Sequence, residues 1–402
     1  MLMKYKEVAI IGGGPAGLFA ALSVCDFYNV DVTVFDYKNH LSTLLPTGGG
    51  RCNLSYYDTD FMSFAKNFPR GEKFLLSVFS SFGMSETIDY FENIGIKTYV
   101  QEDNRIFPIS DSSKITAEIL LKRAKLLGIN LKKGHVKSVK KINEFFGVET
   151  DESSEYFKKI IIATGGKSFE LAKSLGHNIV PPKPSLCPLK IFESDFYSLS
   201  GLSIRDVDAV VEFQNKRISK LKGDILFTED SISGPLAFSV SSVCACLDYS
   251  ETKPVTVKMN ISNLSEEQLN EFFDNAKIKT PKISIKNAVS VICPRNLAKV
   301  ILDFCEIDDM KQVANVSKRE FQKLIQNLSA LELNVYGKKE NLAMVTAGGV
   351  DLKEVNSKTM ASKIVEDLYF AGEVLNIDGF TGGFNLQNCW STARAAARNL
   401  YL

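Results

Sequence analysis

The 402-residue sequence lacks the cysteine patterns that define several redox classes. It has eight cysteines, and none forms Cys-x-x-Cys or the Cys-x4-Cys of disulfide reductases. The only close pair is Cys244 and Cys246, and a disulfide framework is not expected in a chain of this size. The cysteines therefore predict small buried apolar side chains and no redox disulfide.

Further absences limit the partners that the protein can have. No run of about 18 apolar residues indicates a membrane span. The formal net charge is only +1, no sustained basic tract is present, and the three histidines (His40, His135 and His177) are not spaced as metal ligands. Three consecutive glycines and Pro15 break the apolar stretch that could otherwise be read as an export signal. We expect a cytoplasmic protein with a small-molecule substrate and no metal, nucleic-acid or membrane partner.

The strongest pattern that is present lies in residues 7–36. Residues 8–11 form an apolar run typical of a buried parallel strand, and residues 18–22 indicate the start of a helix. Residues 30–36 indicate a second strand that ends in Asp36. The expected contacts with a pyrophosphate between these elements are Gly12, Gly14, Pro15, Ala16 and Gly17.

Each glycine of this turn has a physical role in dinucleotide binding. Gly12 permits the turn, Gly14 leaves room for the pyrophosphate, and Gly17 lets the helix lie close to the strand. The N–H groups and positive dipole end of the helix then hold the phosphates, and Asp36 accepts hydrogen bonds from the adenosine ribose. A glycine turn with only a packing role is the alternative.

A second glycine-rich segment, residues 47–55, follows this motif. It contains Gly48, Gly49 and Gly50, which fill no core and indicate backbone that passes close to a ligand. We expect this loop to lie along the cofactor; a flexible turn is the alternative. The residues expected to contact the cofactor here are Gly50, Arg51, Cys52 and Asn53.

The middle of the chain has a different character from its two ends. Residues 72–95 and 113–127 indicate helices, residues 131–163 indicate β-structure, and the proline-rich residues 181–184 mark a boundary. We assign residues 1–187 and 343–402 to one split domain. The insert, residues 188–342, is expected to be β-rich at 188–260 and 331–342 and helical at 261–330. It carries no glycine fingerprint, so a second nucleotide domain is not expected.

The end of the chain supplies the remaining elements that an FAD domain needs. Gly372-Glu373 follows a buried strand and would bring a carboxylate to the ribityl chain. A final helix, predicted over residues 385–400, would place its N-terminus against the flavin ring and stabilise negative charge there. The remaining expected cofactor contacts are Val136, Thr164, Gly165, Gly372, Glu373, Gly383, Phe384 and Asn385.

At this point the chain closely resembles the FAD-dependent oxidoreductases of the BaiN/YhiN and aminoacetone-oxidase type. The resemblance covers nearly the full length. It implies a glutathione-reductase-type Rossmann-like FAD domain, interrupted by an insert with a β-barrel-like part and a helical part. Bile-acid ene reduction and aminoacetone oxidation are activities assigned within that family. The most specific stretches are residues 47–53, 226–228, 232–235, 347–350, 372–373 and 381–387.

The sequence departs from the family pattern at several points. Residues 40–45 replace a Gly-Lys-Lys-like stretch, Glu229 stands where relatives have histidine, and Asn376 replaces an aspartate. The final helix has Thr392-Ala393-Arg394-Ala395-Ala396 and lacks the usual small Ser-Gly step. The phosphate and ring elements are intact, so these changes affect the expected reaction more than FAD binding.

We therefore expect an FAD-dependent oxidoreductase that passes hydride between the flavin and a small organic substrate. Amine or amino-ketone oxidation and enone reduction are the reactions of relatives, and NAD(P)H docking transiently is a possible electron donor. The alternatives are a flavin-dependent nucleic-acid-modifying enzyme and a non-enzymatic flavin-binding protein. Arg51 and Glu229 are the candidate catalytic groups, Glu229 on condition that burial raises its pKa. Alternatively, Arg51 only braces the FAD and Glu229 is a solvated loop residue.

Overall fold

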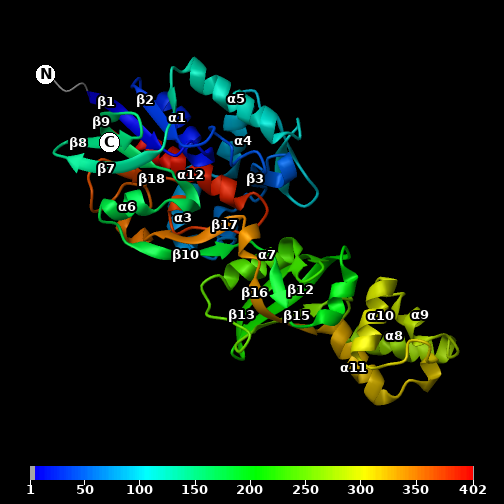
Figure 1. Cartoon of the computed structure of the whole chain (residues 1–402). Coiled ribbons are helices and arrows are strands. Elements are labelled where there is room, and N and C mark those ends of the chain that lie inside the picture. The colour runs from blue at the N-terminus through cyan, green and yellow to red at the C-terminus, as the bar shows by residue number, and fades with distance from the viewer. Residues whose placement is uncertain (1–4, 402) are drawn as a thin grey trace. The chain divides into compact units, whose positions relative to one another are not determined.

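The computed structural model describes residues 5–401 and divides the chain into two compact units (Figure 1). The split unit comprises Met1–Lys183 and Val345–Leu402, and the inserted unit comprises Pro184–Met344. Each is described by itself below.

The split unit is built on a seven-stranded sheet in which β1 lies between β2 and β9. β1 is parallel to both neighbours, β18 is parallel to β9, and the pairs β7–β8 and β8–β9 are antiparallel. The path of the sheet is β6-β2-β1-β9-β8-β7, with β18 attached to β9. Its strands are β1 (Tyr5–Ile11), β2 (Val32–Asp36), β6 (Asn130–Lys133), β7 (Val136–Ile142), β8 (Phe145–Thr150), β9 (Ser154–Ile162) and β18 (Leu368–Phe370).

The core of the split unit lies where α1 (Pro15–Phe27) and α12 (Phe384–Arg398) pack together against this sheet. The central strands are buried on both faces, as their unbroken apolar runs predict. Trp390 of α12 is fully buried, its ring 5.2 Å from those of Phe19 and Phe91, and its indole N–H donates to Leu54 O at 3.0 Å. This contact fixes the last helix against the first.

Shorter elements complete the split unit. A small sheet of order β3-β5-β4 and a two-stranded pair β10–β17 lie outside the main sheet. Residues 72–95, predicted as helical, form α3 and α4, separated at residues 80–83. The bounds are α2 (Phe61–Ala65), α3 (Glu72–Phe79), α4 (Met84–Asn93), α5 (Ser113–Leu126), α6 (Glu170–Ser174), β3 (Ser55–Tyr56), β4 (Thr98–Val100), β5 (Arg105–Pro108), β10 (Ile179–Ser185) and β17 (Val345–Val350).

The inserted unit is a closed six-stranded barrel with a helical part inserted in sequence between its fifth and sixth strands (Figure 1). The barrel order is β11-β14-β13-β12-β15-β16, and the recorded pairs are antiparallel. Its strands are β11 (Leu189–Ile191), β12 (Ser203–Phe213), β13 (Lys216–Phe227), β14 (Ile232–Ser233), β15 (Val255–Asn260) and β16 (Leu331–Lys338). Its helices are α7 (Gly234–Val243), α8 (Glu266–Lys279), α9 (Ile285–Val289), α10 (Arg295–Phe304) and α11 (Lys318–Ser329).

This architecture confirms the predicted fold class, an α/β Rossmann-like domain interrupted by a barrel-and-helix insert. Within residues 5–401, no helix combines the length and apolar character that crossing a bilayer requires. The same residues contain no group of three or more His, Cys, Asp or Glu side chains that could hold a metal ion.

Candidate functional site

The turn between β1 and α1 leaves no room for a Cβ atom at two of its glycines. Gly12 has φ +107°, and a Cβ there would lie 2.3 Å from Ala163 O. A Cβ on Gly17 would lie 1.8 Å from Gly12 O. The helix therefore starts directly against the ends of β1 and β9, as the glycine spacing predicts.

Helix α1 begins without a side-chain cap. Its N-cap is Gly14, in extended conformation, and Pro15 occupies the first turn. The first-turn N–H groups of such a helix form an anion-binding end. Burial raises the pKa of the Cys389 thiol on α12 to about 12. Cys389 is therefore a neutral neighbour of this helix end.

Asp36, at the end of β2, braces the glycine turn. Its Oδ2 accepts from the Gly13 N–H and its Oδ1 from the Lys38 N–H, both at 2.8 Å. Beside it, Tyr37 is exposed, with its ring 6.3 Å from that of His135 and the Lys38 ammonium 5.3 Å from its centroid. Tyr37 and His135 were not among the predicted contacts, although an aromatic residue directly after Asp36 was an available signal.

Residues 40–43 lie on the glycine turn. The Leu41 N–H donates to Gly13 O at 2.8 Å, and Leu41 is buried with φ +61°. A Cβ on Gly13 would lie 2.4 Å from His40 Cδ2, and one on Gly14 would lie 3.2 Å from Thr43 Oγ1. The stretch that departs from the family pattern therefore forms one wall of the turn.

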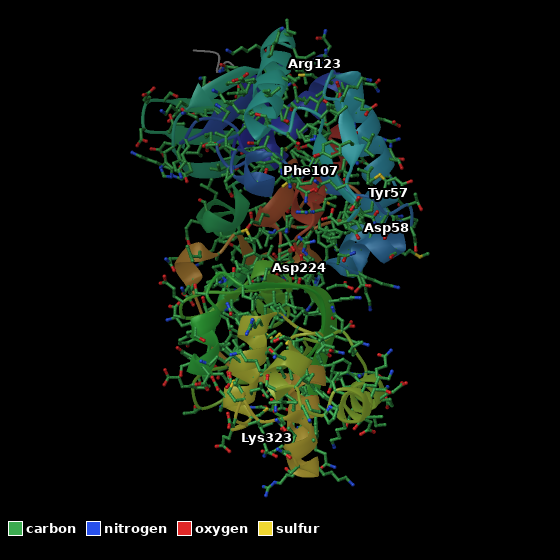
Figure 2. The ribbon with its side chains drawn as sticks, turned by 90° about the vertical axis from the view of Figure 1, so that its right-hand side faces the viewer. Tyr57, Asp58, Phe107, Arg123, Asp224 and Lys323 are labelled. Carbon is green, nitrogen blue, oxygen red and sulfur yellow. The ribbon has the colours of Figure 1, made fainter. Side chains whose placement is uncertain are left out.

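The second glycine loop exposes its backbone. Gly48, Gly49 and Gly50 have φ values of +59°, +69° and +87°, and a Cβ on Gly49 or Gly50 would meet nothing within 4 Å. The Arg51 guanidinium lies 4.1 Å from the centroid of Phe107, and its Nε donates to Gly48 O at 3.4 Å. Figure 2 shows Phe107 inside the split unit. Arg51 thus holds a fixed position beside a loop that is open on one side.

The two residues after Arg51 are buried. Burial raises the pKa of the Cys52 thiol to about 12, although hydrogen bonds with Thr47 and Thr116 oppose this. Cys52 therefore stays a thiol at neutral pH. Asn53 is also buried, and its Oδ1 has no hydrogen-bond partner among the described residues.

The Gly372-Glu373 segment approaches the start of α1. Gly372 has φ +75°, and a Cβ there would lie 2.6 Å from the Ala16 Cβ. Glu373 Oε1 accepts from the Thr346 N–H at 2.7 Å, and a Cβ on Gly166 would lie 2.7 Å from the same oxygen. The late strand end, β17 and the turn after β9 thus meet at the glycine turn.

Helix α12 also begins without a side-chain cap. Its N-cap Gly383 has φ +99°, and a Cβ there would lie 2.5 Å from Ser55 O. Two other contacts predicted for this helix end have local partners. The Asn385 side chain exchanges hydrogen bonds of 2.9 Å with the Gly379 backbone, and Phe384 is buried with its ring 4.9 Å from that of Tyr56.

Three buried asparagine oxygens lie on these elements. Oδ1 of Asn53, of Asn376 and of Asn388 has no hydrogen-bond partner among the described residues. Asn53 follows the glycine loop, Asn376 follows Gly372-Glu373, and Asn388 lies in the second turn of α12. Unsatisfied buried acceptors are costly, so they fit a polar ligand that donates hydrogen bonds between these elements.

Gln387, beside Asn388, anchors the helix. It is fully buried and donates to Gly83 O, Thr87 Oγ1 and Ser391 Oγ, while its Oε1 accepts from Ser55 Oγ. The motif 381–387 contains it, but its role depends on contacts more than 300 residues away in sequence.

One of the remaining predicted residues, Thr164, lies against the glycine turn, because a Cβ on Gly12 would be 3.0 Å from Thr164 Cα. Val136 is buried on β7 opposite Thr150, and the Thr164 hydroxyl donates to Ser168 O at 2.7 Å. A Cβ on Gly165 would meet nothing within 4 Å. Glu229 is exposed on the turn between β13 and β14 of the inserted unit.

The parallel sheet and its uncapped glycine turn define a Rossmann-type dinucleotide-binding fold. The family model described as "HI0933-like protein Rossmann domain" matches residues 6–399. The chain therefore belongs to the HI0933-like family of FAD-dependent Rossmann oxidoreductases, which includes the BaiN type. This membership confirms the predicted family and enzyme class, and it implies a flavin cofactor.

Curated relatives match along their whole length. A ribosomal RNA dihydrouridine synthase of Haemophilus influenzae is 28% identical, with 99% of each chain covered. A 3-dehydro-bile acid delta(4,6)-reductase of Clostridium scindens is 26% identical, with 98% of each covered. A ribosomal RNA dihydrouridine synthase of Escherichia coli is also 26% identical, over 99% of this chain and 98% of the relative.

Two solved structures share the fold at low identity. The 3-ketosteroid delta1-dehydrogenase of Sterolibacterium denitrificans gives a TM-score of 0.51 at 10% identity, covering 98% of this chain and 99% of that one. The FrdA chain of E. coli quinol fumarate reductase gives a TM-score of 0.50 at 12% identity, covering all of this chain and 70% of that one. These likenesses support the flavoprotein fold alone.

Proposed function

We propose that the split unit binds one FAD per chain and that the enzyme reduces a carbon–carbon double bond conjugated to a carbonyl group. One observation carries the cofactor assignment. Two helices without side-chain caps and three partnerless asparagine oxygens occur on the elements that a Rossmann-type FAD domain uses. When bound, the flavin supplies two-electron hydride chemistry.

The early elements of the chain would hold the adenosine diphosphate half of FAD. The start of α1 would hold the pyrophosphate, and Asp36 would accept from the adenosine ribose while keeping its bonds to Gly13 and Lys38. Tyr37 and His135 would contact the adenine. The open backbone of Gly49 and Gly50 would leave room for the cofactor.

The other end of the cofactor meets the late elements. Glu373 and Asn376 would hold the ribityl chain, and the positive end of α12 would stabilise negative charge on the ring. The Asn53 and Asn388 oxygens would accept hydrogen bonds from the cofactor, which would satisfy buried atoms that otherwise lack partners among the described residues.

The substrate class follows from what the relatives have in common. One is named for reducing a bile acid at its delta(4,6) position, and two are named for making dihydrouridine in ribosomal RNA. In both reactions, hydride and a proton are added across a ring double bond that is conjugated to a carbonyl group in the substrate. We infer the same class of acceptor for this chain, with NAD(P)H as the hydride donor to the flavin.

A uracil ring within RNA is the second candidate substrate. Two curated relatives carry that activity in their names, so the near-neutral net charge no longer excludes a nucleic-acid partner. The uneven distribution of the basic residues, described below, also supports this candidate.

An anaerobic reoxidation experiment tests the proposal. The FAD-loaded protein is reduced with NADH or NADPH, the excess donor is removed, and the reduced flavin is mixed with cyclic enones, 3-keto-4-ene steroids or uridine-containing RNA. We expect at least one of these acceptors to restore the oxidised spectrum and to be recovered as the saturated product. Reoxidation by none of them, combined with flavin reduction by amines, would replace the proposal with an amine oxidase.

A further inference from the structure

The positive charge of the split unit is concentrated in one segment. Residues 113–133, which span α5 and β6, contain six basic residues and one acidic residue, Glu118. The whole chain has 48 basic and 47 acidic residues, so this ratio is local. The six are Lys114, Lys122, Arg123, Lys125, Lys132 and Lys133.

Four of these lysines are available to a partner. Lys114, Lys122, Lys125 and Lys133 are exposed, and none has a carboxylate within 4 Å among the described residues. Lys132, in contrast, pairs with Glu155. Separations of 8 and 11 residues place Lys122 and Lys125 on the same side of α5 as Lys114, and the exposed Glu118, four residues from both Lys114 and Lys122, lies on that side too.

The same side of α5 also exposes apolar surface. Leu126 is 73% exposed and Ile115 is 44% exposed, whereas Leu120 and Ala124 on the opposite side are buried in the core. α5 follows the margin of the split unit in Figure 1, and Figure 2 shows Arg123 near that margin. Unpaired cations between exposed apolar groups suit a partner with regular negative charge and apolar rings or sugars.

The surface leads to the proposed cofactor loop within the same unit. Ser113 Oγ, at the start of α5, donates to Leu45 O at 2.6 Å, just before the glycine loop. At the other end, Lys133 is the strand partner of Asp36. A polymer lying on α5 would therefore run beside the loop that precedes Asn53.

We propose that the outward side of α5 and the end of β6 form an RNA-binding surface that holds the phosphate backbone. This α5 surface consists of Lys114, Lys122, Lys125, Lys133, Ile115 and Leu126. The inference rests on the second candidate of the proposed function, reduction of uracil within RNA. Contacts with phosphates position a substrate without reading its sequence, so the surface supplies affinity and not the choice of uridine.

A charge-reversal experiment with a matched control tests the surface. The FAD-loaded protein is titrated with a fluorescein-labelled RNA hairpin whose loop contains uridines, and anisotropy gives Kd between 50 and 200 mM KCl. The test variant is Lys122→Glu with Lys125→Glu. The control is Lys173→Glu with Lys358→Glu, two exposed lysines of the same unit, so both variants change the net charge equally. The flavin content of each variant reports its folding.

We expect the test variant to bind at least tenfold more weakly at 100 mM KCl and the control less than threefold more weakly. The slope of log Kd against log salt should fall by about 2 in the test variant, one for each lost phosphate contact. Equal losses in both variants would overturn the surface, because they would reflect net charge alone. Absence of RNA binding by the parent, or binding only to phosphatidylserine vesicles, would also overturn it.

Reoxidation by a small enone separates this inference from the proposed function. Both lysine variants should reoxidise with the enone at the parent rate, since neither alters the flavin site. If no conjugated acceptor reoxidises the parent's reduced flavin, the proposed function is wrong. The RNA titration would still test the α5 surface in that case. Enone reduction without RNA binding would remove the surface and leave the reductase.

Discussion

The split unit and the inserted unit differ in how they satisfy their buried polar groups. In the described part of the chain, the inserted unit has one partnerless buried side-chain atom, the Tyr249 hydroxyl. The split unit has seven, on Ser23, Asn53, Tyr90, Gln101, Arg123, Asn376 and Asn388. Almost all buried polar side chains of the insert are therefore hydrogen-bonded within it, whereas the split unit keeps buried acceptors that a ligand can satisfy.

The starts of the helices differ within each unit. Asp60 and Ser112 cap α2 and α5 of the split unit, whereas α7 and α10 of the insert begin without a side-chain cap. Ser265, Ser284 and Ser317 cap α8, α9 and α11 of the insert with side-chain hydrogen bonds. In the split unit, α1 and α12 begin at Gly14 and Gly383 with no side-chain cap. A side-chain cap satisfies first-turn N–H groups and stabilises the helix. Without such a cap, these N–H groups are available to an anion.

The largest effect is expected from filling the tightest contact of the split unit. Gly17→Ala places a Cβ where Gly12 O lies at 1.8 Å, so the strand and helix must separate. We expect a loss of about 3 kcal/mol or more in unfolding free energy, the upper end for overpacking, and loss of flavin. Urea unfolding and flavin content measure both. Gly134→Ala, where a Cβ would have its nearest neighbour at 4.0 Å, is the control and should retain flavin.

The second prediction converts an uncapped helix of the split unit into a capped one. Gly14 has an extended backbone, and a side chain there meets only Thr43 Oγ1 at 3.2 Å, so Gly14→Ser is expected to fold. The serine adds a few tenths of a kcal/mol to the stability of the protein without FAD. FAD affinity should fall by more than tenfold, about 1.4 kcal/mol, because the hydroxyl occupies the pyrophosphate site.

An increase in unfolding free energy together with a loss of FAD affinity in Gly14→Ser would support the proposal that the uncapped start of α1 binds the phosphates. Gly14→Ala separates the two effects, because it obstructs the pyrophosphate without supplying a cap. Unchanged FAD affinity in both variants would show that α1 does not face the phosphates.

The third prediction concerns Arg51. Replacing it with methionine removes a charge held 4.1 Å from the Phe107 ring beside the open loop. We expect the rate at which the acceptor reoxidises reduced enzyme to fall at least tenfold, about 1.4 kcal/mol in barrier, with FAD retained. Arg105→Met is the control, since Arg105 lies 5.7 Å from the same ring but pairs with Asp103. Equal rates in both variants would limit Arg51 to bracing the loop.

The smallest effect is expected in the insert, from the capping box of α11. Glu320 accepts from Lys311 and from the Ser317 N–H, and these partners lower the pKa of Glu320 to about 2. A depressed carboxyl pKa adds stability above the unfolded value near 4.5, and that stability is lost as pH falls toward 2. Because the pair is partly exposed, we expect Glu320→Gln to lose at most about 1 kcal/mol at pH 7.

Thermal unfolding between pH 2 and pH 7 checks this prediction. The gap between parent and Glu320→Gln should narrow from about pH 5 downward and disappear near pH 2. FAD affinity at pH 7 should be the same in both proteins. A gap that widens at low pH would contradict the assigned interaction.

The fold was predictable where short-range pattern decides it. The glycine turn, the second strand ending in Asp36 and the final helix lie within a few residues of their predicted places, since apolar runs and glycine spacing specify them. Residues 72–95 were predicted as helical, and the structure divides this range into α3 and α4. Gly83 interrupts it, and Glu86 accepts from the Gly83 N–H to start α4 as a separate helix.

The site was less predictable because it depends on distant partners. Asn385 carries a strong motif position, yet its amide binds Gly379 in the adjacent loop. The oxygens of Asn53, Asn376 and Asn388 lie on three separate segments, and no local sequence pattern shows that they lack partners among the described residues. The sequence motifs indicate which segments are candidates for cofactor binding. Tertiary packing decides which of their side chains have no other hydrogen-bond partner.

The most direct test of this account compares FAD with FMN on flavin-free protein. Fluorescence titration should give one FAD per chain, and FMN should bind at least 100-fold more weakly because it lacks the adenosine half that Asp36 holds. Asp36→Ala should reduce FAD affinity by about 1.5–3 kcal/mol, as for a hydrogen bond to a charged group, and leave FMN affinity unchanged. Equal affinities for FAD and FMN, or no binding of either, would contradict the assignment of the glycine turn and Asp36 to the adenosine diphosphate end of FAD.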